Sequence, residues 1–169
     1  MDIDRFMRIF DEHHQALFRF AYRLTGSSAD AEDIVQECFV ELLRPRGGYD
    51  EKRTPVRTYL FGIVRNQALK RLRKNGLADE LEDEPDRAPS PETELLRSEL
   101  EDVVARAVMR LPETQRVVLV LVHYENMPLA EIAALMELDL GAVKSRLQRA
   151  RAGLKEMLAA CAPGPERRR

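Results

Sequence analysis

Hydrophobic side chains recur every three or four residues along almost the whole chain, which is the period of an amphipathic α-helix. Strict alternation of apolar and polar residues, the pattern of a half-buried strand, is almost lacking. The pattern therefore predicts an all-α protein. The uniformly apolar run Val117–Val122 could be a buried strand by pattern alone. Because no second strand is available to pair with it, we predict a buried helix there.

Breaks in this pattern divide the chain into two parts. Three helices are predicted over residues 3–24, 28–43 and 55–76, the last with Thr54 as its N-cap and Pro55 at its first position. Residues 77–91 are rich in acidic residues and proline, which is the composition of an extended linker. We therefore expect two small helical domains, residues 1–76 and 92–160, joined by this acidic linker. A new helix would begin at Ser90–Pro91, and residues 161–169 would form a disordered tail.

The second domain has the pattern of a helix-turn-helix. Pro128 suits the start of a short helix and Asp139 the N-cap of the next, while the small Ala133 allows the two helices to cross closely. Glu137 stands where the turn often has glycine. The outer face of the second helix carries donors for base edges and phosphates in a major groove: Lys144, Ser145, Gln148, Arg149 and Arg151. An ordinary helical hairpin with a solvated basic face is the alternative.

The charged residues lie in blocks, although the formal net charge is only -2. Residues 28–43 and 78–102 are acidic, and residues 44–75 and 144–155 are basic. Two basic blocks suggest two nucleic-acid contact surfaces, with solvated helix faces as the alternative. In the first basic block, Tyr59 and Phe61 are interleaved with cationic side chains, a combination that can stack bases and hold a single-stranded backbone. The two rings could also be core residues.

The sequence lacks the motifs of an enzyme. It has three histidines, none preceded by glutamate at the spacing of a di-iron site, and neither a glycine-rich phosphate loop nor a nucleophile elbow. We therefore expect no catalysis, no metal and no cofactor. His13 and His14 are predicted on the exposed side of the first helix. The two cysteines, Cys38 and Cys161, are too far apart in the sequence for a zinc motif. Each lies among apolar residues at helical spacing, so both are predicted to be small core residues.

No apolar run approaches the roughly 20 residues that a membrane span needs, and the N-terminus lacks the apolar core of a signal peptide. We therefore expect a cytoplasmic protein without membrane insertion.

Three sequence segments in the second domain resemble, in order and spacing, the C-terminal domain of bacterial RNA polymerase sigma factors. They are LPETQRVVLVL, PLAEIAALMEL and GAVKSRLQRARAGL. The resemblance implies a helix-turn-helix of the winged-helix-like region 4 type, which reads the minus-thirty-five promoter element as duplex and contacts the flap of the second-largest polymerase subunit. It implies that the five donors named above face DNA.

Two sequence segments in the first domain resemble region 2 of the same family. DAEDIVQECFVELL is similar to the helix that docks on the clamp helices of the largest polymerase subunit, which implies docking by Asp33, Gln36 and Glu37; a solvated acidic face is the alternative without the resemblance. VRTYLFGIVRNQALKRLRK is similar to the segment that recognises the minus-ten element as melted strand. By that match Phe61 and Asn66 line a base pocket, the loop Arg46–Val56 helps to hold a flipped base, and four cations serve the strands: Arg57, Arg65, Arg71 and Arg73.

The chain departs from the family pattern at two positions, Tyr59 in place of tryptophan and Lys70 in place of aspartate, so promoter sequence stays open. No middle domain fits between the two halves, as in the extracytoplasmic-function (ECF) subfamily of sigma-70 factors. The resemblance thus implies a sigma factor that binds core RNA polymerase and promoter DNA, with an anti-sigma factor as a further partner. The alternative is a stand-alone helix-turn-helix regulator that senses or dimerises through its N-terminal half.

Overall fold

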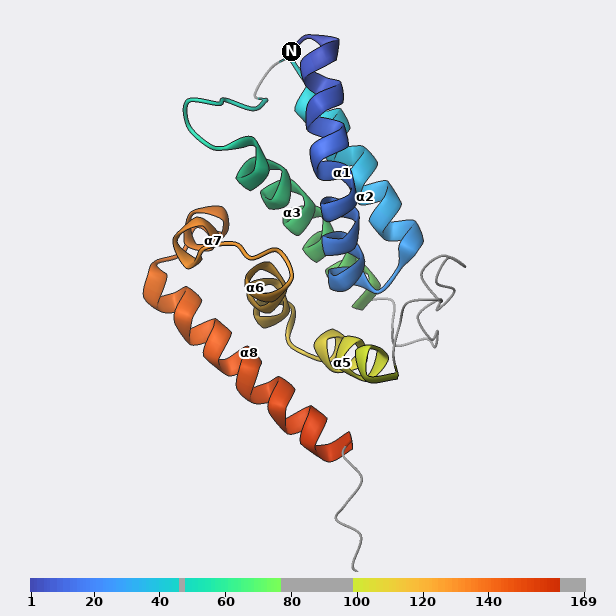
Figure 1. Cartoon of the computed structure of the whole chain (residues 1–169), viewed down its shortest axis with the longest axis vertical. Coiled ribbons are helices and arrows are strands. Elements are labelled where there is room, and N and C mark those ends of the chain that lie inside the picture. Colours follow the sequence, from blue (N-terminus) through green and yellow to red (C-terminus); the bar gives the residue numbers. More distant parts are fainter. Residues whose placement is uncertain (46–47, 77–98, 162–169) are drawn as a thin grey trace, which may run out of the picture.

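The computed structural model describes residues 1–45, 48–76 and 99–161, and every regular element within them is an α-helix (Figure 1). The predicted all-α class is therefore confirmed. Within the described residues, no helix combines the length and the apolar character that crossing a membrane would require.

The first half contains α1 (Ile3–Thr25), α2 (Ser28–Leu43) and α3 (Val56–Gly76), which pack against one another. Local signals set their ends: Gly26 ends α1 in a left-handed conformation with φ 72°. The Ser27 hydroxyl then caps α2 by accepting from the Asp30 N–H at 3.2 Å. The three helices lie where the sequence predicted them, with ends that differ by one residue.

The second half contains α5 (Glu99–Met109), α6 (Glu113–His123), α7 (Leu129–Met136) and α8 (Leu140–Cys161). The run that could have been a strand is helical, and its first five residues are buried from every side within α6. The helix start expected at Ser90–Pro91 lies outside the described residues. Leu100, near the start of α5, is 69% exposed.

Helices α7 and α8 form the predicted helix-turn-helix. Their facing residues are buried: Ile132, Ala133 and Met136 on α7, and Val143, Leu147 and Ala150 on α8. Glu137 makes the turn with φ 54°, a left-handed conformation that glycine more often adopts. Asp139 caps α8, since its Oδ1 accepts from the Ala142 N–H at 2.7 Å.

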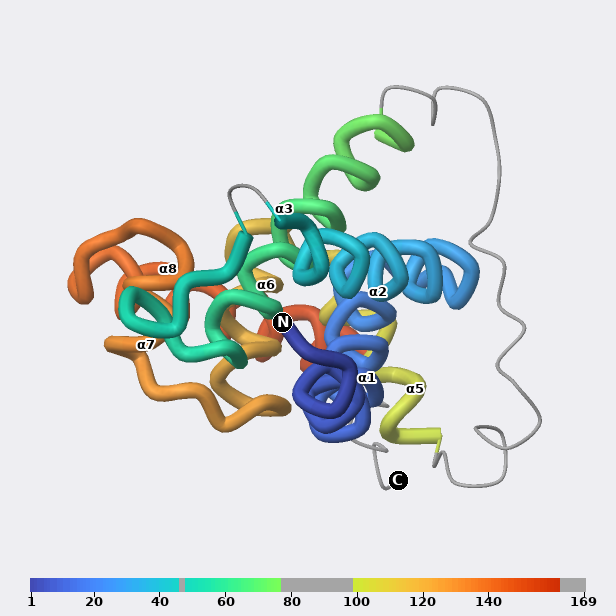
Figure 2. The backbone as a smooth tube through the Cα atoms, turned by 90° about the horizontal axis from the view of Figure 1, so that it is seen from above, coloured from blue at the N-terminus to red at the C-terminus, as the bar shows by residue number. Residues whose placement is uncertain are grey.

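The two halves pack against each other around one continuous hydrophobic core. Helix α6 lies between α8 and the first half, and contacts α1, while α7 contacts α3 (Figure 1). Figure 2 shows α7 beside the beginning of α3, with α2 on the other side of the molecule. The predicted linker, residues 77–91, and residues 162–169 of the predicted tail lie outside the described residues, so the expected domain boundaries stay predictions.

Two side chains lie differently from the prediction. His13 is 7% exposed rather than on a solvent face, because it lies on the buried stripe of α1, one turn from Ile9 and one turn from Leu17. Cys161 is exposed rather than in the core, because it is the last residue of α8 and the fully buried positions of that helix end at Ala150. Cys38 is buried as predicted, and burial raises the pKa of its thiol to about 12.

Candidate nucleic-acid and protein interface

The outer face of α8 carries an uninterrupted row of hydrogen-bond donors. It is opposite the buried residues Val143, Leu147 and Ala150, and Figure 1 shows α8 along the edge of the molecule, away from α1 and α2. The structure places all five residues predicted for duplex recognition on this face and exposes each of them: Lys144, Ser145, Gln148, Arg149 and Arg151. Arg151 also donates from Nε to His123 Nε2 at 3.2 Å. The helix can therefore present these groups to a duplex without rearrangement.

The residues predicted to dock polymerase line one shallow hollow on α2. Asp33, Gln36 and Glu37 are exposed along successive turns, with Val40 beside them at 57% exposure. The remaining lining comes from Glu41, Arg44 and, on α3, Gln67. This acidic rim around an exposed valine suits a protein partner with cationic and apolar side chains.

Arg71 of α3 lies against the same acidic helix. Its Nη1 contacts Asp30 Oδ1 at 3.0 Å and Asp33 Oδ2 at 3.4 Å, and its Nη2 contacts Glu37 Oε1 at 3.0 Å. The three carboxylates are on one face of α2, and one guanidinium spans them. A side chain expected to serve the DNA strands is thus joined to the docking residues in this conformation.

The predicted base pocket is covered in this conformation. Phe61 is 1% exposed and packs on Phe20 with ring centroids 5.1 Å apart, while the Arg57 guanidinium lies 5.6 Å from the centre of the Phe61 ring. Tyr59 is half-buried and packs on Tyr49. Phe61 is therefore a core residue here. In the loop expected to hold a flipped base, residues 46–47 lie outside the described part of the chain.

Two more cations predicted for the melted strand contact the second half of the chain. Arg57 donates from Nη2 to the carbonyl of Glu125 at 2.6 Å. Arg73 donates from Nε to Glu113 Oε1 at 3.3 Å. Both side chains would have to leave these acceptors before they could hold a nucleic-acid backbone.

Arg65 and Asn66 are the remaining residues of the predicted single-strand site. Asn66 is exposed and accepts from Arg65 Nη1 at 2.9 Å. Arg65 Nε is buried and has no hydrogen-bond partner among the described residues. Burial lowers the pKa of Arg65, and the positive charges of Arg146 and Arg73 add to this effect. Arg65 of α3 and Arg146 of α8 therefore bring like charge from both halves to one place.

Arg116 is a structural residue that sequence reasoning missed. It is 7% exposed, and its guanidinium donates to the carbonyl of Leu24 near the end of α1, to that of Met109, the last residue of α5, and to that of Leu111. Burial lowers its pKa. The sequence feature that could have revealed this role is a single arginine immediately before the apolar run of α6. It satisfies helix-terminal carbonyls that would otherwise be buried without donors.

Comparison with known proteins agrees with this geometry. The family model for Sigma-70 region 2 matches residues 9–77, and the model for Sigma-70 region 4 matches residues 101–154. The chain is 32% identical over 158 residues to the ECF RNA polymerase sigma factor SigM of Mycobacterium tuberculosis (strain H37Rv), covering 90% of this chain and 76% of SigM. The chain belongs to the ECF family of RNA polymerase sigma factors. It is also 28% identical over 170 residues to SigW of Bacillus subtilis, covering 93% of this ECF sigma factor and 90% of SigW.

Solved structures resemble this ECF sigma factor over both halves. RpoE from Bartonella quintana, in complex with the anti-sigma factor NepR, aligns with a TM-score of 0.76 and 25% identity over 93% of this chain and 98% of RpoE. CnrH, in complex with the cytosolic domain of CnrY, aligns with a TM-score of 0.72 and 26% identity over 95% and 92% of the two chains. As a sigma factor, the protein acts in promoter-directed transcription.

Proposed function

We propose that this sigma factor binds core RNA polymerase and directs initiation by reading the minus-thirty-five element as duplex through α8 and the minus-ten element as melted strand through α3. The observation that carries the proposal is the presence, on one chain, of an exposed row of donors on α8 and an exposed acidic hollow on α2. A regulator acting alone would have no need of the second surface. This function would place the protein in the cytoplasm, with the polymerase.

The duplex-reading role is supported by the chemistry of the α8 face. Arg149 and Lys144 can donate to the O6 and N7 of guanine, Gln148 can pair with the N6 and N7 of adenine, and Ser145 can bond to either kind of edge. Arg151 lies farther along the helix and suits a phosphate. We assign this face, within residues 92–160, to the minus-thirty-five element, and propose that the same domain contacts the polymerase flap.

The melted-strand role is assigned to α3, within residues 1–76. Asn66 is accessible there, and Arg65 lies next to it. Phe61, Arg57, Arg71 and Arg73 would join them once freed from their present contacts, adding a stacking ring and backbone charge. Residues 77–91 would link the two DNA-binding domains.

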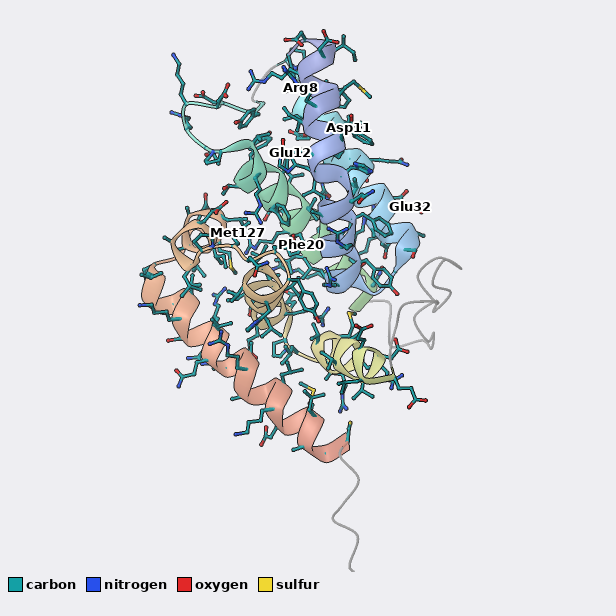
Figure 3. All side chains as sticks on the ribbon, viewed as in Figure 1. Arg8, Asp11, Glu12, Phe20, Glu32 and Met127 are labelled. Atoms are coloured by element: carbon teal, nitrogen blue, oxygen red, sulfur yellow. The ribbon has the colours of Figure 1, made fainter. Side chains whose placement is uncertain are left out.

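The acidic hollow of α2 is proposed to bind the clamp helices of the largest polymerase subunit. Glu37→Lys should weaken binding to core polymerase at least about tenfold, because a like charge would face the cationic partner. Glu32→Lys is the matched control, since Glu32 is exposed at the outer edge of α2 and does not line the hollow (Figure 3).

Binding is measured by titrating labelled full-length chain with purified core polymerase at fixed salt, with circular dichroism to confirm that both variants fold. Equal loss in the two variants would contradict docking through this hollow. Failure of the unmodified chain to bind core polymerase would refute the proposed function.

An anti-sigma factor is the proposed regulatory partner. RpoE and CnrH, which share the arrangement of both halves, were solved in complex with NepR and with CnrY. A corresponding partner of this chain would compete with core polymerase, which can be measured in the same titration.

A further inference from the structure

Two of the three residues proposed to dock polymerase are already bound by a cation of the same chain. The guanidinium of Arg71 donates to Asp33 Oδ2 at 3.4 Å and to Glu37 Oε1 at 3.0 Å. Arg71 belongs to α3, which packs against α2, and Gln67, one turn earlier on α3, lines the docking hollow itself. The docking surface is therefore built from two helices rather than from α2 alone.

The carboxylates that Arg71 contacts form a stripe along α2, which we call the acidic stripe. Its members, Asp30, Asp33 and Glu37, are spaced three and four residues apart and therefore lie on one face of the helix. Like charges at this spacing repel one another. An arginine side chain has a planar fork of donors that can contact several carboxylate oxygens at once. The Arg71 guanidinium therefore fits the stripe and offsets the repulsion within it.

The contact is favourable but accessible to a partner. Partial burial alone would lower the pKa of Arg71, but its hydrogen bond to Asp30 and the charge of Glu37 raise that pKa above its ordinary value. The side chain of Asp33 is 61% exposed and that of Glu37 is 49% exposed. Exposed ion pairs each contribute little to stability. Several cations on one partner can therefore take these two carboxylates from Arg71.

Asp30 holds the guanidinium beside the hollow. Its side chain is 26% exposed, it is not part of the lining of the hollow, and its Oδ1 lies 3.0 Å from Arg71 Nη1. From this position the guanidinium extends to the two lining carboxylates, Asp33 and Glu37. A cation of a partner that approached them would meet a charge of the same sign already in contact with both. Arg71 and the partner therefore require the same acceptors.

We propose that Arg71 belongs to the polymerase-docking surface and competes there with the partner: its guanidinium occupies Asp33 and Glu37 in the free chain, and cations of core polymerase replace it on docking. This inference rests on the proposed docking role of α2. Arg71 thereby lowers the affinity for core polymerase, because apparent affinity falls with the fraction of chains in which the acceptors are free. The displaced guanidinium is then available to the melted strand, as the proposed function of α3 requires.

A purely structural role of Arg71 would change polymerase binding in the opposite direction. If Arg71 only ordered the acidic stripe for docking, its removal would leave the carboxylates less ordered, and binding would weaken. If Arg71 competes, its removal frees Asp33 and Glu37 and makes a surface that binds cations more negative, so binding strengthens. The sign of the change in affinity therefore distinguishes the two roles.

The first test compares Arg71→Ala with Lys70→Ala. Both remove one positive charge from the same turn of α3, but Lys70 is exposed and does not pair with the acidic stripe. Labelled full-length chain is titrated with purified core polymerase at fixed salt and without DNA, at a temperature at which circular dichroism shows every variant folded. Arg71→Ala should bind about three- to tenfold more tightly than the unmodified chain, whereas Lys70→Ala should change the dissociation constant by less than about twofold.

Each result of this titration supports or overturns the competition. Equal gains in Arg71→Ala and Lys70→Ala would show that net charge alone acts, and weaker or unchanged binding of Arg71→Ala would show that Arg71 does not compete. Either result would overturn the inference while leaving the docking role of α2 intact. Failure of the unmodified chain to bind core polymerase would instead refute the proposed function, and the competition with it.

The second test asks whether the gain is produced through the docking carboxylates. In a chain carrying Glu37→Gln, which keeps the shape of the side chain but not its charge, Arg71 withholds less from the partner. The gain from adding Arg71→Ala should therefore be at least about halved. Arg71→Lys keeps the charge but lacks the fork that spans the stripe, so its affinity should lie between those of the unmodified chain and Arg71→Ala. An undiminished gain in the Glu37→Gln chain would overturn the inference.

The third test measures the occupancy of the stripe in the free chain, without polymerase or DNA. In side-chain NMR spectra, the guanidinium protons of Arg71, assigned by their loss in Arg71→Lys, should exchange slowly with water in the unmodified chain. They should exchange faster in Glu37→Gln, because one acceptor is weakened. Fast exchange in the unmodified chain would mean that Arg71 does not occupy the carboxylates and would overturn the inference.

Discussion

Arg149 is exposed in the middle of the donor row on α8, where it can reach a base edge. Replacing it with alanine should weaken binding to the preferred duplex by about 1–3 kcal/mol and relax the base preference at one position. Lys155→Ala, farther along the same helix, should lower affinity little and equally for all sequences. A duplex-binding assay at fixed salt measures both, and unchanged affinity and preference in Arg149→Ala would refute the assignment.

Arg71 spans Asp30, Asp33 and Glu37, and is 24% exposed. Exposed ion pairs contribute about 0.2–1 kcal/mol each, so Arg71→Ala should lower the free energy of unfolding by about 1–2 kcal/mol at low salt and by less at high salt. Denaturant unfolding measures the change. The exposed neighbour Lys70 is the control, and an equal loss in Lys70→Ala would show that the three contacts stabilise nothing.

His13 is buried, and desolvation lowers its pKa below the ordinary value of 6.5, with Glu12 opposing and Arg57 adding to the effect. The unfolded chain therefore takes up a proton at a higher pH than the folded chain. The contribution of His13 to stability is complete above about pH 6.5 and is lost as pH falls from there toward the lowered pKa.

The free energy of unfolding should therefore decline between about pH 7.5 and about pH 5.5 more steeply in the unmodified chain than in His13→Gln. Denaturant unfolding at both pH values measures the difference. Parallel declines would mean that burial of His13 has no effect on its protonation.

At the scale of elements, Asp139 sets the beginning of the recognition helix through its bond to the Ala142 N–H. Asp139→Ala should lower the free energy of unfolding by about 1 kcal/mol and weaken duplex binding, because the first turn of α8 would fray beside Lys144. Asp139→Asn keeps an acceptor and should behave nearly as the unmodified chain does. Equal effects of alanine and asparagine on stability would contradict the capping role.

The helices themselves were predictable because each carries its own signal. The period of the apolar residues located α1, α2 and α3, and the capping residue Asp139 located the start of α8. For α6 the apolar run left strand and helix open, and the lack of a second strand decided for the helix. Arg116 and Cys161 were not predictable in the same way, because whether each is buried depends on which other helices approach. His13 was predictable from the period, since it lies on the stripe of α1 that buries Ile9 and Leu17, but its polar side chain led to the expectation of an exposed position.

At the scale of the molecule, the sequence indicated two surfaces but not their relation. The exposed donors on α8 and the hollow on α2 follow from single helices, so their positions could be anticipated. The contact of α7 with α3 could not be anticipated, because a linker between the two halves does not determine which apolar faces pack together. Arg57 is occupied by the Glu125 carbonyl of the second half, whereas Phe61 packs on Phe20 of its own half, although the types and spacing of both suit single-stranded DNA.

The measurement that most directly tests the account is initiation by purified core polymerase on a pool of promoter fragments, with and without this chain. We expect transcripts only when the chain is present, from fragments that share one minus-ten and one minus-thirty-five sequence. Arg149→Ala should broaden the second sequence, and Glu37→Lys should abolish the transcripts while Glu32→Lys preserves them. A chain that binds duplex DNA but yields no transcripts with core polymerase would contradict the account.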